Sequence, residues 1–173
     1  NRKFSNLEKL IAQLLLSYIK VFEDQSHDYK IALNVIPNNF KNFTLINDAF
    51  VNCYLDNNKV DEAFLKLINP NTLNFTRYNF FYVNFLLSKN RKNEALKILE
   101  RHNNLLDTNL LLDQTKLWFK KGKNYKMKEV FDCNNPNHLI SEFFYLIANL
   151  YSSEENYELS NFYLNISLYL NPD

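Results

Sequence analysis

The feature that most constrains the fold is a short pattern that recurs along the chain at a regular interval. Segment 59–67 reads KVDEAFLKL, and the matching segment 91–99 reads RKNEALKIL. One position per period is small in four of five cases, and the set is Ala32, Ala63, Ala95, Met127 and Ser160. The interval is about 32 residues, a length typical of proteins built from stacked repeats.

A second marker keeps the same period. Thr44, Thr76, Thr108 and Ser141 recur at this interval, and each precedes a run of apolar residues at helical spacing. A hydroxyl at such a place can accept the unpaired N–H groups of a first helical turn. The spacing therefore predicts a helix that begins just after each of these residues.

Each period contains room for two helices joined by a polar turn. The second unit predicts helices over 44–56 and 60–68, and the last unit predicts helices over 141–152 and 157–170. Only one glycine occurs, Gly122, whereas sheets with many tight turns need more. We predict an all-α chain, a single array over 1–173 with five helix pairs at about 5–37, 44–70, 76–102, 108–133 and 141–172.

The last unit resembles the tetratricopeptide repeat. The signature positions of that family fall on Phe144, Ile147, Ala148, Tyr151, Ser160, Leu164, Ser167 and Pro172. The middle units depart from the family because Asn47 and Asn79 stand where an aromatic residue is usual. The resemblance implies a right-handed superhelical solenoid of antiparallel helix pairs, with a concave groove that binds a protein or peptide.

The resemblance also implies which residues face that groove. They are Asn52, Arg77, Phe80, Asn84, Leu112, Lys116, Tyr145 and Asn149. Asn52, Asn84 and Asn149 hold the same repeat position, and an amide can both donate to and accept from a peptide backbone. We call these three the asparagine row, and we expect Phe80, Leu112 and Tyr145 to act as apolar anchors beside it.

No combination of residues points to catalysis or to a metal. The single glycine excludes phosphate-binding glycine loops, and His27, His102 and His138 fall in different repeats. We expect no catalytic residues, no metal and no cofactor, so the chain is not expected to be an enzyme. Cys53 and Cys133 lie about two repeats apart, and we expect buried free thiols rather than a disulfide.

The charge pattern limits the partners. Twenty basic and 19 acidic residues give a net charge of +1, and no basic stripe is visible, so we expect no nucleic-acid partner. The most apolar stretch, 10–22, is too short to cross a bilayer, so we expect no membrane insertion by this segment and a cytoplasmic location. Phe162, Ile166 and Tyr169 of the last helix should be partly exposed and allow self-association.

The function expected from these observations is a non-catalytic scaffold for protein–protein interaction. The alternative is a repeat arm of a larger enzyme, such as a glycosyltransferase, whose catalytic domain lies outside this segment. Because the first residue is Asn1 and the last is Asp173, both ends look like cuts through a longer chain.

Overall fold

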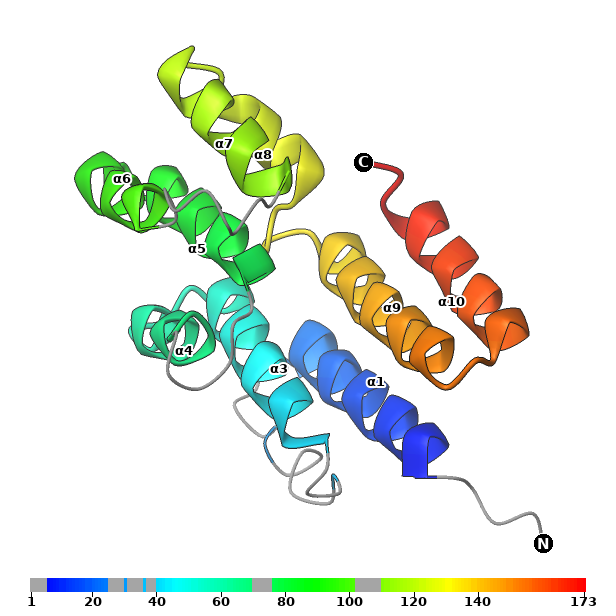
Figure 1. Cartoon of the computed structure of the whole chain (residues 1–173). Coiled ribbons are helices and arrows are strands. Elements are labelled where there is room, and N and C mark those ends of the chain that lie inside the picture. Colours follow the sequence, from blue (N-terminus) through cyan, green and yellow to red (C-terminus); the bar gives the residue numbers. More distant parts are fainter. Residues whose placement is uncertain (1–5, 25–29, 31–35, 37–39, 70–75, 102–109) are drawn as a thin grey trace, which may run out of the picture.

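The described part of the chain is all-helical. A computed structural model describes residues 6–24, 30, 36, 40–69, 76–101 and 110–173, and no strand occurs among them. The helices are α1 (Asn6–Asp24), α3 (Lys41–Tyr54), α4 (Val60–Leu67), α5 (Thr76–Ser88), α6 (Lys92–Glu100), α7 (Leu110–Lys120), α8 (Tyr125–Val130), α9 (Pro136–Ser153) and α10 (Tyr157–Leu170). The predicted all-α class is confirmed (Figure 1).

Four helical hairpins, α3–α4, α5–α6, α7–α8 and α9–α10, share one kind of turn. The turn residue with a positive φ is Asp56 (48°), Asn90 (60°), Gly122 (65°) or Glu155 (59°). In each case the next N–H donates to a carbonyl five positions earlier, as from Lys123 to Trp118 at 2.8 Å. This is the Schellman motif that ends many helices. The turns recur at nearly the same interval as the sequence pattern, so the period in the sequence corresponds to a period in the backbone.

The small residues expected at the start of each second helix are largely buried. Ala63 and Ala95 are buried in α4 and α6, and Ser160 is half-buried in α10. Met127 takes this place in α8 and is completely buried, so the core accommodates its longer, flexible side chain. Ala32 lies outside the described residues.

Two of the expected helix starts are wrong. α9 begins at Pro136, well before Ser141, because Asn135 accepts the N–H of Asn137 as the cap and proline suits the first helical position. α3 begins at Lys41, and the Thr44 hydroxyl donates to the Lys41 carbonyl inside the first turn.

The other two markers fare differently. α5 begins at Thr76, next to the predicted start just after this residue. Thr108 lies outside the described residues.

The last hairpin folds back onto the first helix. α9 packs along α10 and also against α1. Figure 1 shows α9 and α1 side by side. The rings of Tyr18 in α1 and Phe143 in α9 have centroids 6.2 Å apart. A simple open array would bring only neighbouring hairpins together, so this return is a departure from the expected arrangement.

The segment that follows α8 explains the return. Phe131 lies 5.2 Å from the ring of Phe50 in α3 and 4.3 Å from the ring of Phe81 in α5, measured between centroids. These contacts hold the segment against α3 and α5, and α9 starts from there. The path of the chain is therefore set by aromatic packing in the middle of the molecule.

The two cysteines correct a second expectation. Cys53 at the end of α3 and Cys133 after α8 form a disulfide with a Cα–Cα distance of 5.9 Å, across 80 residues of sequence. The expected separation by two repeats was wrong because the segment after α8 crosses back to α3. Neither cysteine is a free thiol.

The outer face of α10 is exposed, as expected. The side chains of Phe162 and Tyr169 are 55% and 87% exposed, and Ile166 is half-buried. Self-association through this face stays a prediction.

Candidate functional site

The residues expected to line one groove do not share one surface. Four of the eight are buried in the packed interior: Asn52, Phe80, Asn84 and Leu112. Phe80 contacts Phe81, with ring centroids 5.4 Å apart, and so contributes to the core rather than to an exposed anchor. α5 packs against both α6 and α7, and its residues Phe80 and Asn84 are buried.

The buried members of the asparagine row bond to the protein itself. Asn52 donates to the Asp48 carbonyl at 2.6 Å and accepts from the Asn57 amide at 2.7 Å, which fastens the turn after α3. Asn84 donates to the carbonyls of Met127, at 3.0 Å, and Phe131. The Met127 carbonyl also accepts the N–H of Phe131 at 3.0 Å. The last carbonyls of a helix have few or no partners within it, so Asn84 acts as a side-chain cap for α8.

Asn149, the third member of the row, and Lys116, another expected groove residue that is half-buried, lie on separate hairpins. Asn149 on α9 is exposed and donates to the Tyr145 carbonyl at 3.0 Å. Lys116 on α7 is paired with Asp113 at 3.7 Å. The three asparagines therefore do not present a continuous row to a ligand.

Two of the expected residues do come together, Arg77 on α5 and Tyr145 on α9. The guanidinium of Arg77 lies 4.6 Å from the ring centroid of Tyr145. It also donates to both carboxylate oxygens of Glu142, at 2.9 and 2.7 Å. Such a two-pronged pair fixes the orientation of the guanidinium as well as its position.

The balance of forces on Arg77 explains why it needs this partner. Burial alone would lower the pKa of Arg77, but the neighbouring Glu142 carboxylate raises it overall. Arg77 lies in the first turn of α5, where the helix dipole disfavours a positive charge. The Glu142 side chain is only 4% exposed, whereas that of Arg77 is 39% exposed. The buried Glu142 carboxylate therefore orients the Arg77 guanidinium, which is the group accessible to a ligand.

A cavity of about 190 Å³ opens beside this pair, between α5, α9, α10 and the segment after α8. We call it the Arg77 pocket. Its wall combines the Arg77 and Tyr145 side chains with apolar groups from Phe81, Leu164 and Leu168. Two of the five N–H groups of Arg77 are used by Glu142.

Polar contacts hold the other walls of the Arg77 pocket in place. Ser141 and Ser167 exchange hydrogen bonds, each hydroxyl donating to the other's carbonyl at 2.9 Å. The Asn171 amide donates to the Val130 carbonyl at 2.8 Å and ties the end of α10 to the end of α8. His138 accepts the Asp132 N–H at Nδ1, 2.8 Å away, and burial lowers the pKa of His138, so this nitrogen stays an acceptor at neutral pH.

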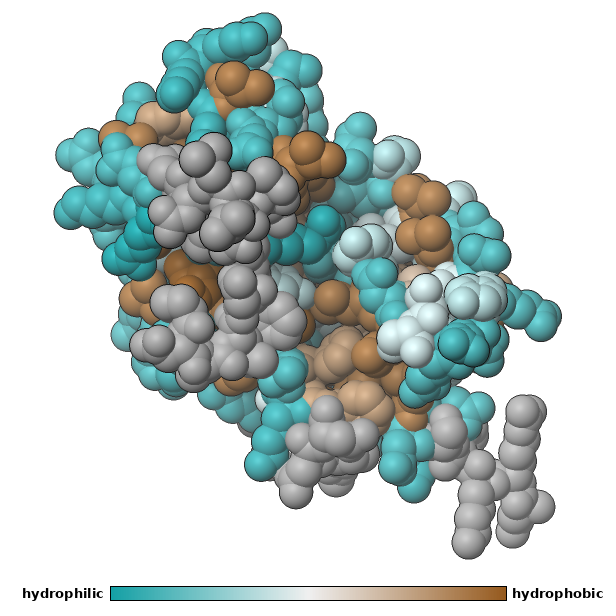
Figure 2. Space-filling view, in the orientation of Figure 1, coloured by the Kyte–Doolittle hydropathy of each residue, from teal (hydrophilic) through white to brown (hydrophobic). Residues whose placement is uncertain are grey.

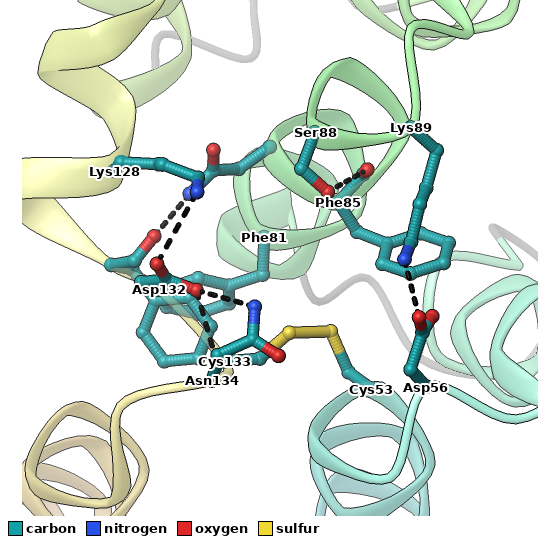
Figure 3. Close-up of a pocket in the computed structure, with 12 residues that line it drawn as sticks. Cys53, Asp56, Phe81, Phe85, Ser88, Lys89, Lys128, Asp132, Cys133 and Asn134 are labelled. Carbon is teal, nitrogen blue, oxygen red and sulfur yellow. Dashed lines mark hydrogen bonds and ion pairs between the residues drawn. A yellow bond between two sulfur atoms is a disulfide. The ribbon is translucent and has the colours of Figure 1, made fainter.

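A second, much smaller cavity surrounds the disulfide. Figure 3 shows the bridge between two ion pairs, Lys89 with Asp56 at 2.5 Å and Lys128 with Asp132 at 3.6 Å. The space measures about 20 Å³, room for about one water molecule. This cavity is therefore a small gap in the packing around the disulfide, and it is too small to receive a ligand.

The sequence could not identify most of the Arg77 pocket. Arg77 and Glu142 are 65 residues apart and belong to hairpins that are not neighbours in the chain. Local periodicity places each residue on a helix face but says nothing about which distant face it meets. The same holds for Cys53 and Cys133.

Within the ranges that the structure describes, no group of three or more histidine, cysteine or acidic side chains could hold a metal ion. Among the helices described, none combines the length and the hydrophobicity needed to cross a bilayer.

Compared with known protein families, curated proteins and solved structures, the chain matches none of them.

Proposed function

We propose that this chain is a non-catalytic protein-binding module of helical hairpins, related in design to tetratricopeptide solenoids, and that a partner peptide binds at the Arg77 pocket. The support for the repeat design is the recurrence of one Schellman turn at close to the period of the sequence pattern. The support for the site is the convergence of Arg77 and Tyr145 on one cavity.

The size of the Arg77 pocket favours a partner side chain over a cofactor. Sites for small molecules usually enclose about 300–1,000 Å³, and this cavity encloses about 190 Å³. A fixed guanidinium and an aromatic ring at the rim of an apolar hollow are typical of the anchoring points in protein interfaces. One side chain of a partner, with its flanking backbone, fits these dimensions.

Selection from a random peptide display library on the immobilised chain tests this proposal. We expect the enriched peptides to bind the wild type with an affinity that falls at least tenfold in Tyr145→Ala. Arg77→Lys should cause a similar loss because lysine keeps the charge but lacks the planar fork of donors. Leu96→Ala, an exposed change on α6, is the matched control and should bind as the wild type does.

Two outcomes would overturn the proposal. A library that yields no binder argues against a peptide-binding function. Binders that respond equally to Leu96→Ala and Tyr145→Ala would show that the pocket is not their site. Circular dichroism of each variant separates loss of binding from loss of fold.

The disulfide changes the location that we propose. Disulfides persist in oxidising compartments and are rare in the cytosol. Because the two cysteines of the chain form one buried bridge, we propose an oxidising compartment in place of the expected cytoplasmic one. The native material is quenched rapidly in acid and alkylated under denaturing conditions, because both cysteines are buried. No label on either cysteine would support this location, and full labelling would refute it.

A further inference from the structure

The net charge of +1 conceals a strongly basic hairpin. Residues 110–130, which form α7, α8 and their turn, contain six lysines against Asp113 and Glu129, a net charge of +4. The rest of the chain is therefore negative. A net charge close to zero does not exclude a local cluster of lysines in one hairpin, and the expectation of no nucleic-acid partner stays a prediction.

The lysines gather at the end of this hairpin. Lys120, Lys121 and Lys123 flank Gly122 in the turn, and all three are exposed. Within the described part of the chain, none of the three forms an ion pair or a side-chain hydrogen bond. Their charges are therefore available to a partner.

The hairpin projects from the body of the molecule. In Figure 1, α7 and α8 extend away from α9 and α10, with the turn at their outer end. Figure 2 shows mostly hydrophilic side chains at that end, with a hydrophobic patch among them. A convex projection of this kind can touch a broad flat surface, whereas an extended peptide or nucleic acid is usually held in a groove.

Apolar side chains lie beside the lysines. Leu117 is 48% exposed, and it precedes Lys120 and Lys121 by three and four positions, so all three share a face of the helix end. Tyr125 is 59% exposed at the first position of α8. We call the set of Leu117, Lys120, Lys121, Lys123 and Tyr125 the lysine tip.

We propose that the lysine tip docks this protein on the surface of an anionic phospholipid bilayer. The lysines interact with the headgroups, while Leu117 and Tyr125 enter the boundary between headgroups and acyl chains. Basic clusters with adjacent apolar and aromatic residues bind anionic membranes in this way without spanning them.

The composition of the lysine tip disfavours nucleic acid. Stacking on bases requires a series of exposed aromatic rings, and in this hairpin Tyr125 is exposed whereas Trp118 and Phe119 are half-buried. An exposed leucine contributes nothing to a phosphate backbone. It does contribute to partition into a lipid interface, because that binding scales with buried apolar area.

Flotation with lipid vesicles tests the proposal on the full chain. We expect binding to vesicles of phosphatidylcholine with about 30% phosphatidylglycerol at about 50 mM salt, little binding to pure phosphatidylcholine, and release at about 500 mM salt. The triple variant Lys120→Gln, Lys121→Gln, Lys123→Gln should lower the partition coefficient about 100-fold, since each surface lysine contributes about fivefold.

Two matched variants separate the causes. Lys41→Gln, Lys92→Gln, Lys97→Gln removes the same charge from exposed positions elsewhere and should lower binding only slightly. Leu117→Asn leaves the charge unchanged and should lower vesicle binding several-fold, which a purely Coulombic contact with an acidic protein would not show.

Three results would overturn the proposal. One is an equal loss in the two triple lysine variants. Another is full binding by Leu117→Asn. The third is tighter binding to a single-stranded oligonucleotide or to polyglutamate than to anionic vesicles at the same salt concentration, which would assign the lysine tip to a different class of partner.

Discussion

At the scale of single residues, asparagine has opposite roles at equivalent positions of the repeat. Asn84 is buried and donates to two carbonyls at the end of α8, whereas Asn149 is exposed and bonds only within its own helix. The same residue at the same repeat position thus serves the interior in one hairpin and the surface in another. Burial, which depends on the neighbouring hairpin, decides which role it takes.

We predict that Asn84→Ala lowers the free energy of unfolding by about 2–3 kcal/mol. The Phe131 carbonyl loses the Asn84 donor, and the Met127 carbonyl keeps only the N–H of Phe131. Asn149→Ala, the matched exposed change, should alter the free energy of unfolding by less than about 0.5 kcal/mol. Urea denaturation of both variants measures the difference. Equal effects would show that Asn84 does not cap α8.

The Arg77–Glu142 pair yields a second prediction at this scale. Arg77→Met should destabilise the fold by about 3 kcal/mol, because it leaves the Glu142 carboxylate buried without its partner. This is the low end of the usual range, since the guanidinium is partly exposed. The double variant Arg77→Met, Glu142→Met should recover most of the loss, because it removes the buried charge itself. A double variant no more stable than Arg77→Met, in thermal and urea denaturation, would contradict this account.

At the scale of helices and turns, three of the four Schellman turns place a residue other than glycine at positive φ. That conformation costs a side chain about 1 kcal/mol or more. Only the α7–α8 hairpin uses glycine there. Asp56 and Asn90 bear less of this cost, because aspartate and asparagine tolerate the left-handed region better than other side chains, whereas Glu155 bears it in full.

The cost of a positive φ can be tested by adding a glycine at one of these turns and by removing the glycine from another. Glu155→Gly should stabilise the fold by about 0.5–1 kcal/mol, and Gly122→Ala should destabilise it by about 1 kcal/mol. Glu154→Gly is the control, because Glu154 has φ of −90° and gains nothing from glycine; it should lose about 0.5–1 kcal/mol. Thermal melts of the three variants should rank Glu155→Gly highest, and any other order would count against the assigned turn geometry.

The elements that the sequence predicts well are those defined by neighbouring residues. Val60 and Ala63 of α4, and Ile147 and Ala148 of α9, lie on the buried faces that their spacing indicates. The start of α9 was missed because Asn135 and Pro136 form a stronger start signal than Ser141. For the Arg77 pocket, the sequence indicated Arg77 and Tyr145 as binding residues but not that they meet. They meet because α9 returns to the middle of the molecule, and no local pattern in the sequence encodes that return.

At the scale of the whole molecule, one covalent bond and one aromatic cluster hold the middle of the chain closed. The Cys53–Cys133 bridge and the Phe131 ring both fix the segment after α8 against α3. This segment leads directly into α9, so it determines where the last hairpin can lie. The position of α9 beside α1 depends on this closure.

We predict that the double variant Cys53→Ala, Cys133→Ala lowers the free energy of unfolding by about 3–4 kcal/mol, since a bridge across a long loop greatly restricts the unfolded chain. A reducing agent should lower the stability of the wild type by a similar amount and leave the variant unchanged. Urea denaturation with and without a dithiol compares the four cases. A wild type insensitive to reductant would show that the bridge is absent from the protein in solution.

The same bridge keeps part of the contour length of the chain from being extended. If the two ends are pulled apart, the 80-residue loop between the cysteines stays closed however many of its helices come undone. At about 3.5 Å per extended residue, about 280 Å of contour is withheld from the stretched chain. A dithiol releases that length in one step. In a force-extension experiment this protein therefore has two maximum extensions, and the redox state of its surroundings selects between them.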